Sequence, residues 1–423
     1  MDKISDKITR RNVLAASAAT IGTSAATAIV DAATETAGAA TAPRTPAETF
    51  HLWVFSDAHS MTDKAVTAAI RNGMEFIPPV GYPESLANAL RQSEEGSPLG
   101  GPAFRWDLAL DLGDNAGLWE IPGDDQGREV VRQFAALSKH RREQIYSLAG
   151  NHDASPQDAP SSAGKPTNWW FRKWIDPMGE STESSGVDPT KRPYPIEGTW
   201  ERYAFKVGNI RILMMSDRND LPYPVGRRIT GGGSPAGAVT GETFAWWQQQ
   251  VEAARDEIVI SCHHHMLRET TVGSGDFEGI SRYADGRIHS GRFHGADGVP
   301  EGASYLYFVD SQPKAQRFEH YLAEHPGAVD LWLGGHTHTH PDEVVNGRGR
   351  IERKWGTNFV NCAQLSKYHS FVTSPPMSRH FTFTSGSNLA RVRCYLHDDS
   401  HAPQGWYPPA ERVLELSKPF FMG

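Results

Sequence analysis

The chain has 423 residues, of which 39% are hydrophobic and 22% are charged, as in an ordinary globular protein and unlike a disordered chain. Its formal net charge of −8 argues against binding to nucleic-acid polymers or anionic membranes, which needs an excess of basic residues. A small anionic substrate is still compatible with this charge, because bound metal ions can dominate a site locally. The three cysteines, Cys262, Cys362 and Cys394, are too few for a disulfide framework, and no pair is spaced for a sulfur-rich zinc site.

Residues 1–49 differ in composition from the rest of the chain. Arg10 and Arg11 precede a weakly apolar run rich in alanine, serine and threonine, which resembles an export signal of the twin-arginine type. We predict a signal peptide at residues 1–32 and a linker at 33–49. The twin-arginine export machinery would then be a partner, and the mature protein would be periplasmic or extracellular. A membrane anchor is the competing interpretation, although so weakly hydrophobic a run suits a bilayer poorly.

Five short apolar runs follow, and each ends in a cluster of Gly, Asp, Asn or His: residues 50–59, 106–115, 144–153, 256–265 and 328–338. Apolar residues at helical spacing lie before three of them, within 129–140, 244–254 and 318–322. This alternation predicts a layered α/β domain. Ligands of open α/β sheets bind beyond the carboxyl ends of the strands, which is where all five polar clusters would lie. Two strand pairs, at 199–217 and 378–397, suggest a second sheet.

The polar residues at these strand ends form one chemical set. Its members are Asp57, His59, Asp114, Asn151, one histidine from 263–265, His336 and His338. Oxygen and nitrogen donors without a thiolate suit Mn²⁺, Zn²⁺ or Fe better than a sulfur-bound structural zinc. Seven ligands are too many for one tetrahedral ion and suit two divalent ions that share a carboxylate, the arrangement that clamps a phosphoryl group and activates the hydroxide between the ions.

In their order along the chain, these motifs resemble those of the calcineurin-like metallophosphoesterases. They read Asp57-Ala58-His59, Gly113-Asp114, Gly150-Asn151-His152-Asp153, a histidine after a strand, and Gly335-His336-Thr337-His338. The resemblance covers roughly residues 50–340. It implies a four-layer α/β/β/α sandwich of two mixed sheets, which we expect over residues 50–400, with a C-terminal extension at 401–423 packing on the core.

The resemblance also implies a role for each motif residue. Two sets of metal ligands are implied, which are Asp57, His59 and His338 for the first ion, and Asn151, His336 and a central histidine for the second. Asp114 would bridge both ions. His152 would contact the phosphoryl oxygens or protonate the leaving group, and Asp153 would orient His152.

The central histidine has two candidates. In the family this ligand usually stands two places before a proline, and Met266 occupies the place of that proline here. This position selects His264, with His263 as the rival. We expect His340 to be a bystander. Gly117 stands where purple acid phosphatases carry a metal-binding tyrosine, so an iron(III)–tyrosinate site is not expected.

The resemblance therefore predicts an exported phosphoesterase that hydrolyses small phosphate esters by attack of a metal-bound hydroxide, with phosphodiesters slightly favoured. A phosphomonoesterase or nucleotidase is the alternative, and a catalytically inactive metal-containing binding protein is a more distant one. The aromatic cluster Trp169, Trp170 and Trp174 either packs an inserted helix or lines a pocket for a sugar or base. Three arginines either contact phosphate or are solvated surface charges: Arg227, Arg228 and Arg268.

Overall fold

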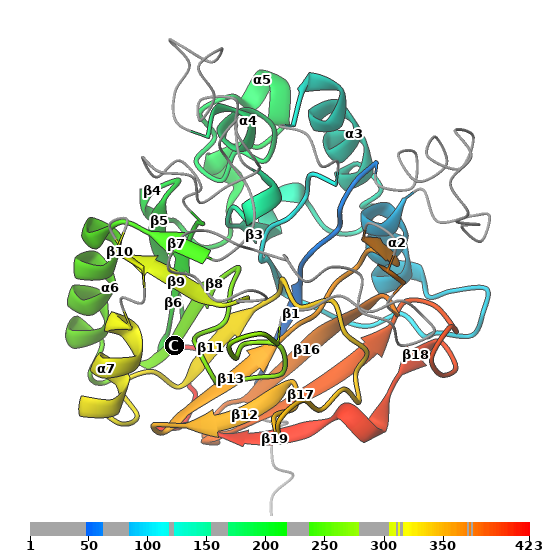
Figure 1. Cartoon of the computed structure of the whole chain (residues 1–423). Helices are drawn as coiled ribbons and strands as arrows, with labels where there is room; N and C mark the ends of the chain where they lie inside the picture. Colours follow the sequence, from blue (N-terminus) through cyan, green and yellow to red (C-terminus); the bar gives the residue numbers. More distant parts are fainter. Residues whose placement is uncertain are drawn as a thin grey trace, which may run out of the picture. The chain divides into compact units, whose positions relative to one another are not determined.

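Two large mixed β-sheets form the centre of the fold (Figure 1). The first, here called the β1 sheet, has a parallel core of three strands that is extended on one side by antiparallel strands. Its order is β18 (Gly405–Trp406), β17 (Leu389–Leu396), β16 (Met377–Thr384), β1 (Thr49–Phe55), β2 (Leu108–Asp111) and β3 (Ile145–Ser147), with β19 (Arg412–Glu415) paired to β17.

The second, here called the β8 sheet, contains four neighbouring parallel strands with an antiparallel strand or hairpin at each edge. Its order is β12 (Ile351–Lys354), β13 (Thr357–Asn361), β11 (Leu331–Gly334), β8 (Ile258–His263), β6 (Ile210–Met215), β5 (Arg202–Val207) and β4 (Glu197–Thr199). Two small sheets complete the strands, β7 (Gly237–Val239) with β9 (Leu306–Val309) and β10 (Gln312–Pro313), and β14 (Tyr368–His369) with β15 (Val372–Thr373).

The computed structural model describes residues 48–61, 84–117, 122–153, 168–217, 237–278, 304–309, 312–313, 316–369, 372–373 and 375–423. The expected signal peptide lies outside these residues, as does nearly all of the linker. Among the described residues, no helix combines the length and the apolar character that a membrane span requires. The helices are α2 (Ser85–Glu95), α3 (Asp124–Phe134), α4 (Trp169–Trp174), α5 (Thr182–Ser185), α6 (Gly241–Ala253) and α7 (Arg317–Glu324).

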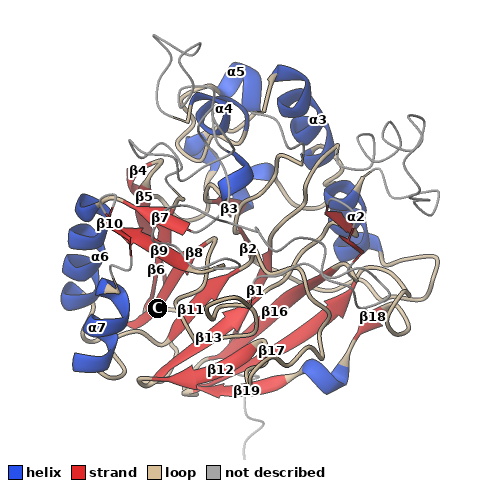
Figure 2. Ribbon diagram, viewed as in Figure 1, coloured by secondary structure: helices blue, strands red, loops and turns tan. Residues whose placement is uncertain are grey.

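Side-chain alternation along the central strands creates the layers, because successive residues of a strand face opposite sides of its sheet. On β1, Phe50, Leu52 and Val54 enter the core between the two sheets, while Trp53 and Phe55 face the helices. Helices α2, α3 and α4 supply the buried side chains of that outer layer. On the far side, α6 and α7 cover the outer face of the β8 sheet (Figure 2). The expected four-layer α/β/β/α sandwich of two mixed sheets is confirmed.

All five expected apolar runs form strands, namely β1, β2, β3, β8 and β11. The strand pairs at 199–217 and 378–397 suggested a second sheet, and the structure has two large sheets but divides these pairs between them. The first pair forms β5 and β6 at one edge of the β8 sheet, and the second forms β16 and β17 beside β1. Each pair carries buried apolar side chains on one face, so each extends an existing core.

Two further segments take up positions on this core. In the C-terminal segment, β18 and β19 both pair with β17, and Phe420 is buried between the sheets. In α4, Trp170 and Trp174 are buried against α3 and the β1 sheet, which favours the packing interpretation of the tryptophan cluster over a ligand pocket.

Candidate metal centre

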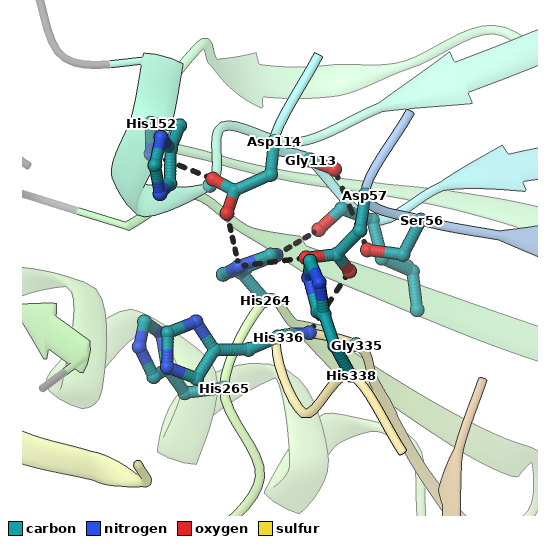
Figure 3. Close-up of polar contacts among 12 residues, drawn as sticks. Ser56, Asp57, Gly113, Asp114, His152, His264, His265, Gly335, His336 and His338 are labelled. Atoms are coloured by element: carbon teal, nitrogen blue, oxygen red, sulfur yellow. Dashed lines mark hydrogen bonds and ion pairs between the residues drawn. The ribbon is translucent and has the colours of Figure 1, made fainter. Parts of the chain in front are cut away.

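The carboxyl ends of five parallel strands carry the candidate ligands. Strands β1, β2 and β3 lead into the first three motifs, while β8 and β11 lead into the histidines of the other two. Backbone hydrogen bonds hold the first two motifs side by side, since the N–H of Asp57 donates to Gly113 O at 2.8 Å and that of His59 to Asp114 O at 3.0 Å. The structure therefore brings the motifs of both sheets to one place (Figure 3).

Left-handed backbone conformations redirect the chain at these strand ends. Asp57, His59, Asp114 and His336 have φ angles of 55°, 43°, 58° and 64°. Such angles are uncommon for residues other than glycine and cluster at functional sites, where surrounding contacts maintain them. Here each turn ends a buried strand and presents its side chain to the common centre.

Asp57 lies at the centre of the first ligand set. Its Oδ1 is 2.8 Å from His338 Nε2 and 3.5 Å from His59 Nε2, and the two imidazole nitrogens are 3.2 Å apart. Asp57 and His59 are fully buried, and His338 is nearly so. Three donor atoms at these separations can share one ion, because neighbouring ligands of a tetrahedral ion lie roughly 3.3 Å apart.

Asp114 joins the two ligand sets. Its Oδ2 lies 3.0 Å from His264 Nε2 and 3.9 Å from His59 Nε2. Its Oδ1 accepts a 2.6 Å hydrogen bond from the backbone N–H of His152. His264 is oriented by its other ring nitrogen, because Nδ1 donates to Leu112 O at 2.7 Å. This leaves His264 Nε2 directed at Asp114, the usual arrangement of a metal-binding histidine.

His336 and Asn151 complete the second set of candidate ligands. The backbone N–H of His336 donates to Asp57 Oδ2 at 2.9 Å, and the His336 ring lies 5.2 Å from that of His264. Asn151 is fully buried and begins the 3-10 turn Asn151–Asp153 that follows β3. Asp57, His59, Asp114, His264 and His338 thus meet at one centre, with Asp57 and Asp114 as its two carboxylates, and the backbone of His336 is joined to Asp57.

The charge balance of this centre fits divalent cations. Burial favours the neutral forms of Asp57 and Asp114, but the neighbouring histidines, His264 foremost, together outweigh it and lower the pKa of each carboxyl. Burial also opposes a charge on His264, yet Asp114 and Asp57 raise its pKa to about 10. Two buried carboxylates therefore attract positive charge into a pocket that offers imidazole nitrogens and no thiolate among the described residues, the donor set of Zn²⁺, Mn²⁺ or Fe.

Asp153 contributes to the centre in a way that the sequence did not indicate. Its carboxylate accepts N–H groups from Asp114 and Gly150 at 2.9 Å each, from Asn115 at 2.9 Å and from Ala116 at 3.0 Å. Burial and the nearby Asp114 raise the pKa of Asp153 to about 7. These contacts position the backbone that carries Asp114, whereas the sequence suggested a carboxylate that orients His152.

Sequence reasoning missed a second support, which holds the loop after β11. Asn361, at the end of β13, donates to Gly335 O at 2.9 Å and accepts from Arg350 at 2.7 Å. The buried Arg350 also donates to backbone carbonyls of Thr337, Thr339 and His340. The available signal was the short segment 357–361, in which Phe359 and Val360 are followed by Asn361, as polar residues follow the other strands that end at the centre.

The remaining candidates lie apart from the two carboxylates. His263 faces Asp217 instead, at 3.8 Å, because neighbouring strand residues point in opposite directions. His340 forms a 3.0 Å ion pair with Glu343, and Arg268 forms a 2.7 Å ion pair with Asp276. Arg227 and Arg228 lie outside the described residues.

The chain is similar to known proteins of one family. The model of the family described as calcineurin-like phosphoesterase matches residues 50–340. Similar solved structures include a predicted phosphoesterase from Streptococcus pneumoniae TIGR4, with 10% identity, a TM-score of 0.30, and coverage of 87% of this chain and 98% of that one. Another is Vacuolar Protein Sorting 29 from Cryptosporidium parvum, with 12% identity, a TM-score of 0.29, and coverage of 88% and 99%. No curated protein matched the chain.

Proposed function

The chain belongs to the calcineurin-like phosphoesterase family, whose members are hydrolases of phosphoric esters, and we propose that it hydrolyses small phosphate esters at a centre of two divalent metal ions. The observation that carries the proposal is the position of Asp114. Its Oδ2 faces His264 of one ligand set and His59 of the other. When bound, two ions of Mn, Zn or Fe would supply Lewis-acid charge for the phosphoryl oxygens and activate a water molecule for in-line attack.

Different residues of the chain would hold the ions and act on the substrate. Asp57, His59 and His338 would hold one ion, Asn151, His264 and His336 the other, and Asp114 both. His152 stands beside this centre, with its ring 4.8 Å from the His59 ring and nearly perpendicular to it. Its backbone contact with Asp114 ties its position to the bridging carboxylate. The His152 imidazole would bind a phosphoryl oxygen or deliver a proton to the leaving oxygen.

We propose phosphodiesters as better substrates than phosphomonoesters. Among the residues that the structure describes, the largest Coulombic effects on the pKa of Asp57 and Asp114 come from histidines and, for Asp114, from Asp57, and not from lysine or arginine. A diester carries one negative charge, whereas a monoester carries up to two near neutral pH, so a diester makes less demand on cationic side chains. The alternative is monoesterase or nucleotidase activity, and a comparison of turnover on a diester and on a monoester distinguishes the two.

The first experiment measures turnover of bis-p-nitrophenyl phosphate and p-nitrophenyl phosphate by the purified chain with added Mn²⁺. We expect the diester to have the higher kcat/KM. Asn151→Ala should lose activity together with bound metal. His152→Ala should lower kcat by about 10²- to 10⁴-fold with metal content retained, as expected for removal of an acid–base group. Absence of turnover with metal bound would instead favour a metal-containing binding protein.

We also propose export of the folded protein by the twin-arginine machinery, supported by the paired Arg10 and Arg11 before a weakly apolar run. Cell fractionation should find the wild-type chain outside the cytoplasm. Replacing both arginines by lysine should retain it inside, because the export machinery reads the arginine pair. Unchanged export of the double variant would rule out this route.

A further inference from the structure

A second group of buried polar side chains lies next to the metal centre and has no role in the proposed reaction. Asp217 follows β6, His263 ends β8, and His265 comes two residues later. All three residues are fully buried. The centroid of the His265 ring lies 3.9 Å from that of His336, with the ring planes tilted by 35°, so the group borders the centre without including its carboxylates.

The donor atoms of this group converge. Asp217 Oδ2 lies 3.1 Å from His265 Nδ1 and 3.8 Å from His263 Nε2, and one donor atom of each residue lies within 4.8 Å of the others. Neighbouring ligands of a tetrahedral ion with bonds of about 2.0–2.1 Å lie roughly 3.3 Å apart. The observed separations bracket this value.

Among the described residues, the buried carboxylate of Asp217 has few hydrogen-bond donors. Its Oδ1 has no hydrogen-bond partner among the described residues, and Oδ2 accepts a long 3.3 Å bond from the N–H of Ala238 besides facing His265 Nδ1. Burial raises the pKa of Asp217 to about 7. A buried carboxylate with few donors is strongly unfavourable unless a cation or a proton neutralises its charge.

His263 offers a nitrogen to this carboxylate. Within the described part of the chain, His263 Nε2 also has no hydrogen-bond partner. Its Nδ1 lies 3.3 Å from His265 O and 3.0 Å from the His265 N–H, so either tautomer finds a backbone partner. The tautomer that donates to the carbonyl leaves the Nε2 lone pair directed at Asp217. His264 shows the same arrangement, with Nδ1 bound to Leu112 O and Nε2 facing Asp114.

We propose that Asp217, His263 and His265 form a further metal site, separate from the two-metal centre, that takes a divalent transition ion such as Zn²⁺. Two imidazoles and one carboxylate are a zinc donor set, whereas Mg²⁺ and Ca²⁺ prefer oxygen ligands. The ion would tie the end of β6 to the end of β8. Gly237 packs against this site, where an added Cβ would lie 2.6 Å from the His265 ring, so β7 covers the site closely.

Metal analysis of the full-length chain tests this proposal. Wild type and Asp217→Asn are incubated with excess zinc chloride, freed of unbound metal by gel filtration, and measured for zinc per chain by mass spectrometry. Asp217→Asn should bind about one equivalent less, because it loses the only carboxylate of the site. Asp176→Asn is the matched control. Asp176 is also fully buried but accepts N–H groups of Glu180 and Ser181, so its zinc count should equal that of wild type.

Further variants separate the possible outcomes. His263→Gln should lose the same equivalent and replaces Asp217→Asn if the latter does not fold. Asn151→Ala should lose zinc from the two-metal centre but keep the equivalent that depends on Asp217. The zinc counts therefore test the two-metal centre and the Asp217 site independently of each other. Equal zinc counts in wild type, Asp217→Asn and His263→Gln would overturn the proposal and leave a metal-free Asp217–His265 ion pair. If neither variant folds, a wild-type count of no more than about two equivalents overturns it.

Discussion

At the scale of single residues, Gly335 determines how closely the two sheets approach at the centre. A Cβ at this position would lie 2.2 Å from Ser56 Oγ and 2.5 Å from Asp57 Oδ2. Both distances are far below van der Waals contact, and Asp57 accepts the His336 N–H from the same loop. Only glycine lets this loop of the β8 sheet lie against the end of β1.

We therefore expect Gly335→Ala to lower kcat/KM for bis-p-nitrophenyl phosphate by about 10- to 100-fold, the usual cost of disturbing the support of a metal ligand. The added methyl group must displace Asp57 or the histidine loop. Gly123→Ala is the control, because a Cβ there meets no atom of the described residues within 4 Å, and it should keep nearly full activity. Equal kcat/KM values for the two variants would show that the loop accommodates the added methyl group without loss of activity.

At the scale of elements, Glu94 fixes the end of α2 to the segment before β3. Its buried carboxylate accepts N–H groups of Ser138, Lys139 and His140 and contacts the His140 ring at 2.9 Å. Burial opposes its charge, but the Ser138 and His140 hydrogen bonds lower the pKa of Glu94 to about 2. Because the folded pKa lies below the unfolded one, the stabilisation is complete above about pH 4.5 and is lost as pH falls towards 2.

Glu94→Gln should lower the free energy of unfolding at pH 7 by about 2–3 kcal/mol. Urea unfolding measured from pH 7 down to pH 3 should show this deficit shrinking below about pH 4.5, where wild type loses the same contribution. Glu95→Gln, at the exposed neighbouring position, should match wild type throughout. A deficit that stays constant with pH would mean that packing, and not the carboxylate charge, holds this contact.

At the scale of the whole molecule, the metal centre exists only where the two sheets meet. The β1 sheet carries Asp57 and Asp114, while the β8 sheet carries His264, His336 and His338. Ions bound here would bridge both halves of the sandwich. Anything that binds only the folded state stabilises it, by about 2.7 kcal/mol at a hundredfold excess over Kd.

Removal of metal with EDTA should therefore lower the Tm of the whole chain by several degrees, and added Mn²⁺ or Zn²⁺ should restore it. Differential scanning calorimetry measures the shift. Asp114→Asn should show a much smaller response, because it removes the carboxylate shared by both ligand sets. The idea that the centre links the sheets fails if the wild-type Tm is unaffected by chelation.

The periodicity of the sequence and the order of its motifs predicted much of the fold and of the candidate site. Five apolar runs that end in polar residues indicated the strands, their layering and the candidate ligands, because a strand's face and its end are local properties of the sequence. The choice between His263 and His264 required the structure, since adjacent residues differ only in the direction that the folded strand gives them.

Contacts between segments far apart in the chain were decided by the tertiary structure alone. The sequence could not pair Asn361 with Gly335 and Arg350, assign Asp153 to four backbone N–H groups, or place Asp217 against His265. Nor could it show that the two outer strand pairs extend different sheets. Sequence pattern records which residues are buried and where strands end, whereas the partner of each polar group depends on how the sheets pack against each other.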